Sequence, residues 1–147
     1  MRISDVIHQK GTSVVTAPAD EKVEQLVALL ADNGIGAVVV TDEDYGVIGI
    51  AGERDVVKAL RVHGEAALRL TVAEIMSAPV RTCAPGDDIT GVAGLMTAFR
   101  VRHVPVVVDG RLTAIVSIGD IVKSRIDDLQ SETEYLTNYV HGRPVPT

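Results

Sequence analysis

The chain has 147 residues and a formal net charge of −6, and 46% of its residues are hydrophobic. This length fits one compact domain or two very small ones that share a core, and the hydrophobic fraction excludes a disordered chain. The acidic balance argues against a general nucleic-acid or anionic-membrane surface, so a bound phosphate would need a local basic or backbone-amide site.

The single cysteine, Cys83, excludes an internal disulfide and a cysteine-rich zinc site. The four histidines are scattered without the spacing of metal ligands. No apolar run is long enough to span a bilayer, and the polar N-terminal residues lack the apolar segment of a signal peptide. We therefore expect a cytoplasmic protein that has no metal site, requires no cofactor and binds neither nucleic acid nor a membrane.

Two stretches of the chain carry the same pattern in the same order, which is the signature of an internal duplication. Each begins with a short helical segment, Ile3–Ile7 in the first copy and Val72–Met76 in the second. A short extended segment follows, Val14–Thr16 and Val80–Thr82, and an Ala-Pro pair ends each one. Two related units placed side by side predict pseudo-two-fold symmetry and paired clefts.

Capping residues mark where the predicted helices begin. Thr71 and Glu74 have the spacing of a capping box at the second short helix. Asp20 and Asp87 follow the Ala-Pro pairs and are the expected N-caps of a long helix in each copy.

The rest of each copy predicts a long helix, two strands and a final helix. The apolar positions of the long helix recur at spacing i, i+3, i+4 and i+7, as Val23, Leu26, Val27 and Leu30, then as Ile89, Val92, Ala93 and Met96. The strands are Val38–Val40 and Val47–Ile50, then Val104–Val108 and Leu112–Val116, and Asp109-Gly110 is a hairpin signal. So small a sheet cannot be covered on both faces by its own copy, so we expect α/β repeats packed sheet to sheet.

The repeats are expected to span 1–66 and 67–126, followed by a C-terminal helix and tail over 127–147. The helix is predicted from apolar or small residues at helical spacing, namely Ile126, Leu129, Thr133, Leu136 and Val140. It either completes the core of its own subunit or covers a neighbouring one. Gly142 is expected to end it, ahead of a loose tail over 143–147. Apolar helix faces left over by two short repeats favour a homodimer.

The ends of the second strands carry the most telling motif. The second copy reads Val101–Val107 and then Ile115–Ile121, and the first copy has Gly49–Asp55 in the same register. The cystathionine-β-synthase (CBS) domain family ends this strand with Gly, two apolar residues, Ser or Thr, two variable positions and Asp. Almost the whole chain resembles a tandem CBS pair, or Bateman module, of the free-standing bacterial type. The resemblance implies a dimeric regulatory module that binds AMP, ATP, NAD or S-adenosylmethionine in the clefts between its repeats.

The chemistry of the motif suits a nucleotide. A carboxylate accepts two hydrogen bonds at once, as the two ribose hydroxyls require, and a hydroxyl near a helix N-terminus can reach a phosphate. By resemblance, the second cleft is formed by Ser117 and Asp120, with Arg102 and His103 at its mouth, Thr82 and Ala84 beside it, and Val104 and Pro105 around the adenine. By the same resemblance, the first cleft is formed by Asp55, with Thr16, Gly36, Ala37 and Val38 lining the adenine slot and Arg54 near the phosphates.

The two clefts are chemically unequal. Gly52 stands at the Ser/Thr position of the first copy, and Ala114 stands at the Gly position of the second. We predict that the cleft with Ser117 and Asp120 binds an adenosine phosphate more tightly than the cleft with Asp55. A plainer interpretation stays open, in which both aspartates serve only as helix caps.

Three classes of function follow from these patterns. The first is a ligand sensor that acts on an unidentified regulated protein. The second is a structural dimerisation module without a physiological nucleotide. An enzyme is not expected, because the sequence shows no activated nucleophile, phosphate-binding Gly-Lys-Ser/Thr loop or metal cluster.

Overall fold

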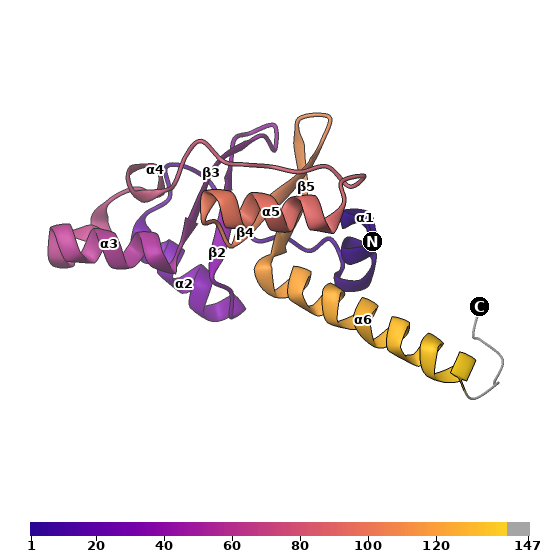
Figure 1. Cartoon of the computed structure of the whole chain (residues 1–147). Coiled ribbons are helices and arrows are strands. Elements are labelled where there is room, and N and C mark those ends of the chain that lie inside the picture. Colours follow the sequence, from indigo (N-terminus) through magenta and orange to yellow (C-terminus); the bar gives the residue numbers. More distant parts are fainter. Residues whose placement is uncertain (141–147) are drawn as a thin grey trace.

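The computed structural model describes residues 1–140, apart from the side chain of residue 139, and it shows two α/β repeats side by side (Figure 1). The first repeat and the connection after it comprise α1 (Ile3–Lys10), β1 (Thr16–Ala17), α2 (Val23–Asn33), β2 (Ala37–Thr41), β3 (Val47–Gly52), α3 (Glu53–His63) and the 3₁₀ helix η1 (Gly64–Arg69). The second repeat comprises α4 (Val72–Ile75), α5 (Ile89–Phe99), β4 (His103–Val108), β5 (Arg111–Ser117) and α6 (Ile118–Val140).

The repeats form two small sheets. In the first, β2 pairs in parallel with β1 and antiparallel with β3; in the second, β4 pairs antiparallel with β5. The second copy of β1 is reduced to one parallel bridge between Cys83 and Val106. There the Cys83 amide donates to the Pro105 carbonyl at 2.9 Å, and the Val107 amide donates to the Cys83 carbonyl at 2.9 Å. The pairing therefore lies just after the predicted extended segment 80–82.

Each sheet has buried residues on both of its faces. On one face, alternate strand residues such as Val38 and Val104 pack with the long helix of the same repeat. On the other face, Val39 and Pro105 are fully buried as well. The two sheets therefore pack against each other, as the duplication predicts.

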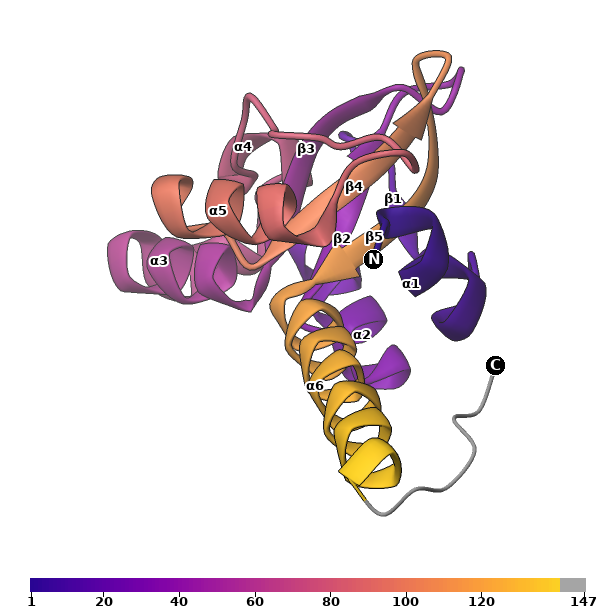
Figure 2. The same cartoon turned by 45° about the vertical axis from the view of Figure 1, so that its right-hand side comes forward.

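The two short lead-in helices are exchanged between the repeats. Ile3 and Val6 of α1 are buried in the core of the second repeat, where α1 lies beside β5 and the start of α6 (Figures 1 and 2). Val72 of α4 is buried in the core of the first repeat, and its amide donates to the Glu21 carbonyl at 2.7 Å. Each lead-in helix thus completes the core of the other repeat.

Two local predictions are confirmed. The Thr71 amide donates to Glu74 Oε2 at 2.7 Å, which is the predicted capping box. Asp109 and Gly110 join β4 to β5 with φ values of 51° and 77°. Positive φ at both central residues is what a two-residue hairpin of this handedness requires.

The predicted caps of the long helices are wrong by one or two residues. α2 begins after Lys22 rather than Asp20, and α5 begins after Asp88, whose side chain accepts from an amide of the first turn at 3.3 Å. Asp87 accepts instead from the Ala84 amide at 2.8 Å. Asp20 and Asp87 belong to the turns that follow the Ala-Pro pairs, so each long helix starts later in the chain.

The predicted C-terminal helix is not a separate element, because α6 runs without a break for 23 residues from the second repeat. Ile121 and Ser124 are buried, whereas Leu129 and Leu136 are 49% and 56% exposed. The outer part of α6 projects from the body of the molecule (Figure 2), so packing within its own subunit ends near Ser124. Gly142 and the predicted tail over 143–147 lie outside the described residues.

Cys83 offers a test of the bridge to β4. Burial, together with the nearby Asp87 carboxylate, raises the pKa of the Cys83 thiol to about 11. Because only the thiolate reacts, we expect the native protein at pH 8 to be alkylated by iodoacetamide roughly 100-fold more slowly than the denatured chain. Mass spectrometry over a time course measures both rates. Equal rates would show that the thiol is not held against the sheet.

Candidate functional site

A cleft of about 510 Å³ lies at the seam between the two repeats. The first repeat contributes the start of β2, the turn from β3 to α3 and the exposed side of α3. The second repeat contributes the segment after α4 and the turn from α5 to β4. The lining residues are Gly36, Ala37, Ile50, Gly52, Glu53, Arg54, Asp55, Lys58, Ser77, Pro79, Val80, Arg81, Phe99, Arg100, Val101, Arg102 and His103.

Asp55 sits in the first turn of α3, with both carboxylate oxygens directed to hydrogen bonds. Its Oδ2 accepts from the Gly52 amide at 2.9 Å, and its Oδ1 accepts from the Ser77 hydroxyl at 3.0 Å. The first contact is the capping role that the plainer interpretation expects. The second joins the carboxylate to the segment that follows α4, so Asp55 is held in place at the cleft wall.

The structure explains why the first copy of the motif lacks a hydroxyl. A Cβ on Gly52 would lie 2.6 Å from the Gly36 carbonyl oxygen, a backbone atom that cannot move aside. The same carbonyl accepts from the Glu53 amide at 3.0 Å. Close approach of the two strands therefore leaves room only for glycine at this position.

Asp120 makes the same capping contact as Asp55, at the start of α6, but its other partners differ. Its Oδ2 accepts from the Ser117 amide at 2.8 Å, and its own amide donates to the Ser117 hydroxyl at 3.2 Å. Lys10, at the end of α1, donates to the same Oδ2 at 2.6 Å and to the Ile115 carbonyl at 2.9 Å. A cation from the exchanged helix thus already holds the carboxylate expected to bind ribose.

These contacts change the pKa of Asp120. Partial burial by itself would raise it, but the hydrogen bonds from Lys10 and Ser117 and the charge of Lys10 outweigh burial. The pKa of Asp120 therefore lies below its ordinary value.

His103 lines the large cleft, and its backbone pairs with Ser117, three residues before Asp120. Its ring is next to the backbone of Gly36, since a Cβ built there would lie 3.7 Å from His103 Cε1. Burial and the charges of Lys10 and Arg102 lower the pKa of His103, and they outweigh the opposite effect of Asp120 and Glu53. The imidazole is therefore neutral at pH 7, with one nitrogen as a donor and one as an acceptor.

The residues expected to bind ligand fall into three groups. Those that line the 510 Å³ cleft are Gly36, Ala37, Arg54, Asp55, Arg102 and His103. Those at or beside the turn held by Lys10 are Ser117 and Asp120. Those that lie elsewhere are Val38, Val104 and Pro105, fully buried in the sheets, Thr16 in β1, and Thr82 and Ala84, exposed on either side of Cys83.

The structure therefore brings residues from both expected sites into one cleft. The resemblance places Arg102 and His103 in the second cleft, but the turn that carries them lines the same cleft as Asp55. Sequence reasoning missed Lys58, Phe99 and the segment 77–81, which line the same cleft. The sequence signal for this part of the cleft is the run of basic residues around Arg100. Its role depends on which cleft the turn before β4 lines.

Two α/β repeats with exchanged lead-in helices and a cleft of about 510 Å³ at their seam define the class of this protein, a tandem α/β repeat module. The family model described as "CBS domain" matches residues 3–62 and 72–127. This chain belongs to the CBS domain family.

Known relatives agree with this assignment. The mitochondrial CBS domain-containing protein CBSX3 of Arabidopsis thaliana is 31% identical over 95% of this chain and 72% of its own length. The solved structure of a CBS-domain-containing protein from Agrobacterium tumefaciens is 42% identical, with a TM-score of 0.82 over 85% of this chain and 99% of that one. A CBS domain pair solved in complex with 5′-methylthioadenosine and S-adenosyl-L-methionine is 25% identical, with a TM-score of 0.77 over 87% of this chain and 98% of that one.

The ion pair between Lys10 and Asp120 makes a testable contribution to stability. Its side chains are 31% and 22% exposed, so we expect Lys10→Gln to lower the free energy of unfolding at pH 7 by about 0.5–1 kcal/mol. Because the pKa of Asp120 is lower in the folded state, this contribution is present above the unfolded pKa of about 3.9 and is lost as the pH falls further.

Urea denaturation at several pH values measures the effect of Lys10→Gln. Lys123→Gln, on the exposed side of α6, is the matched control and should change little. The hydrogen bond from Lys10 to the Ile115 carbonyl does not depend on this carboxylate, so a difference that stays constant as the pH falls below the pKa of Asp120 would contradict the ion-pair explanation.

Proposed function

We propose that this CBS pair is a regulatory module that binds an adenosine-containing ligand of the AMP, ATP, NAD or S-adenosylmethionine type. The observation that carries the proposal is the 510 Å³ cleft at the seam, in which Asp55 of one repeat faces Arg102 and His103 of the other. A ligand in this position contacts both repeats, so its binding free energy depends on how they sit together. Such coupling is what a sensor that acts on a regulated protein needs.

Two further facts support an adenosine ligand. A related CBS pair was solved with 5′-methylthioadenosine and S-adenosyl-L-methionine. The cleft also contains a carboxylate for ribose hydroxyls and small residues, Gly36 and Ala37, beside which a flat base fits. We propose that the module requires no cofactor for this role and that it has no catalytic role. Among residues 1–140, no group of three or more metal-binding side chains comes together.

The contacts favour the Asp55 cleft as the principal site. The sequence predicts the opposite ranking, because Ser117 supplies a hydroxyl to the cleft with Asp120, and that ranking stays a prediction. However, a ribose at Asp120 has to displace Lys10 from the carboxylate, whereas Asp55 contacts only a neutral amide and a neutral hydroxyl. Displacing a charged partner costs more than displacing a hydroxyl.

Calorimetry with two matched variants decides between the sites. We expect Asp55→Asn to weaken AMP binding by about tenfold or more, because the amide replaces an acceptor with a donor, and Asp120→Asn to change it little. Circular dichroism must show both variants folded, since each also loses a capping carboxylate. A larger loss for Asp120→Asn would instead support the ranking based on Ser117. If no adenosine compound raises the melting temperature of the wild type, the sensor proposal fails.

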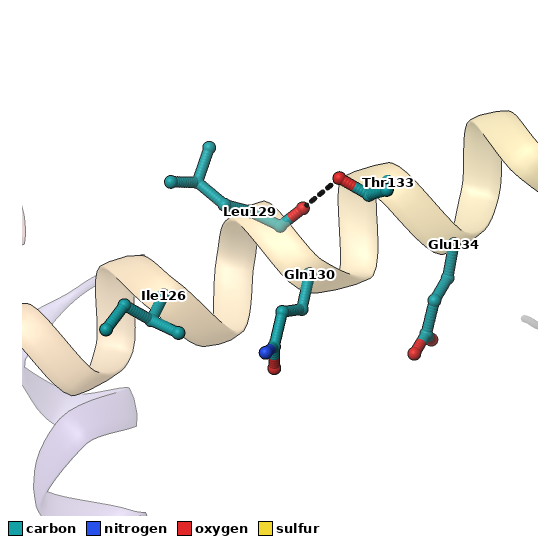
Figure 3. A pocket seen from close by; sticks show the side chains of 5 residues that line it. All are labelled: Ile126, Leu129, Gln130, Thr133 and Glu134. Atoms are coloured by element: carbon teal, nitrogen blue, oxygen red, sulfur yellow. Dashed lines mark hydrogen bonds between the residues drawn. The ribbon is translucent and has the colours of Figure 1, made fainter.

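We also propose that the exposed part of α6 forms a homodimer contact. The exposed apolar side chains of the helix are Ile118, Val122, Ile126, Leu129, Tyr135, Leu136 and Val140. From Val122 onward, the apolar residues other than Tyr135 follow alternating steps of four and three residues, with Thr133 at one of the positions. This is the spacing of a coiled-coil seam. The shallow concavity along Ile126, Leu129 and Thr133 is lined by this one helix (Figure 3), so a second helix fits it better than a small molecule.

Sedimentation at micromolar concentration tests the homodimer. We expect a dimer for the wild type and a monomer for the double variant Leu129→Ser, Leu136→Ser, because two apolar anchors of the stripe are lost. Glu132→Gln, which lies off the stripe, is the control and should remain dimeric. A monomeric wild type would exclude this contact.

The second candidate function is a structural dimerisation module, and the apolar stripe of α6 is the observation that favours it. The cellular compartment and the regulated protein are proposals as well, with cytoplasmic location the expectation from the sequence. Within residues 1–140, no helix has both the length and the apolar character that a membrane crossing needs.

A further inference from the structure

The seam cleft has a charge opposite to that of the chain. Five of the fourteen basic residues line it, but only two of the twenty acidic residues do, so the cleft is positive in a chain of net charge −6. The basic residues are Arg54 and Lys58 on α3, Arg81 after α4, and Arg100 and Arg102 on the turn before β4. Three segments that are far apart in the sequence therefore bring cations to one cavity.

None of these five cations forms an ion pair with a carboxylate in the described part of the chain. The ion pair found among residues 1–140 joins Lys10 to Asp120, outside the cleft. Scattered exposed cations are usually a solvated surface, but cations that converge on one cavity repel each other. A polyanion placed among them relieves that repulsion, and the positive end of the α3 dipole acts in the same direction.

One of the cations is held at the wall by an aromatic ring. The guanidinium of Arg81 lies 3.9 Å from the centroid of Phe99, the only phenylalanine of the chain. This cation–π contact keeps Arg81 at the cleft rather than extended into solvent. The charge is therefore partly preorganised before a ligand arrives, which lowers the entropy lost on binding.

We propose that the seam cleft selects adenosine nucleotides with a polyphosphate chain over adenosine ligands that carry positive charge. The proposal rests on the proposed function and adds the class of ligand. Asp55 remains the contact for ribose, and the five cations face the phosphates. S-adenosylmethionine carries a sulfonium and an ammonium against a single carboxylate, so the same cations repel it.

Calorimetry on the full chain, without divalent metal, tests the selectivity. The probes are ATP, AMP, adenosine, S-adenosylmethionine and inorganic tripolyphosphate. We expect ATP to bind at least about tenfold more tightly than AMP, and S-adenosylmethionine more weakly than AMP. The affinity for ATP should fall as salt rises, because the cations are exposed and screened, while that for adenosine should not.

Three single variants assign the effect to the cleft. Lys58→Gln and Arg81→Gln should each weaken ATP binding about threefold or more and leave adenosine binding unchanged. Arg61→Gln removes a charge from the same helix as Lys58 but outside the cleft, so it should leave both affinities unchanged. Equal losses for ATP and adenosine would overturn the assignment of these residues to phosphate.

The probes separate failure of the inference from failure of the proposed function. S-adenosylmethionine binding as tightly as ATP, or AMP as tightly as ATP, overturns the selectivity and leaves the adenosine site standing. Tripolyphosphate binding as tightly as ATP means that adenosine is not recognised, which overturns both. Absence of binding by every adenosine compound also overturns both.

Discussion

α1 precedes the first repeat in the chain, yet Ile3 and Val6 are buried in the core of the second. Val72 of α4 makes the reciprocal contact in the first core. Every contact that joins the two repeats is constrained by this exchange, because neither core is complete without a helix from the other. Separating the repeats would expose fully buried side chains, each of which contributes on the order of 1.5–3 kcal/mol by burial. The seam, and the cleft in it, are therefore fixed by hydrophobic packing rather than by surface contacts.

The exchange also makes the two motif aspartates unequal. Lys10 is the last residue of α1, whereas Met76 and Ser77 come directly after α4. Lys10 reaches the carboxylate of Asp120, whereas Met76 packs so closely on Gly49 that a Cβ there would collide with its sulfur. Asp120 is thus held by a cation, whereas Asp55 accepts from a neutral amide and a neutral hydroxyl. A duplicated chain can in this way keep two motifs of similar sequence and give them different availability to a ligand.

The charge of the cleft differs in sign from the charge of the whole chain. The chain as a whole is acidic, which keeps it from binding anions over its general surface. The cleft gathers basic side chains from both repeats, so the attraction for an anion is confined to one place. His103 lies at the edge of the cleft and is neutral at pH 7, because burial and nearby cations lower its pKa. It provides hydrogen bonding there without adding charge.

By itself the sequence determined the duplication, the strands, the hairpin at Asp109-Gly110 and the capping box of Thr71 and Glu74. These features depend on interactions between residues close in the chain, which periodicity and turn chemistry reveal. Only the tertiary structure decided which core each lead-in helix enters and which residues share a cleft. Arg102 and Asp55 are brought to one cleft by packing between distant segments, and no local pattern carries that information. The start of α2 and the unbroken length of α6 were decided in the same way, because a turn and a packed helix depend on what lies against them.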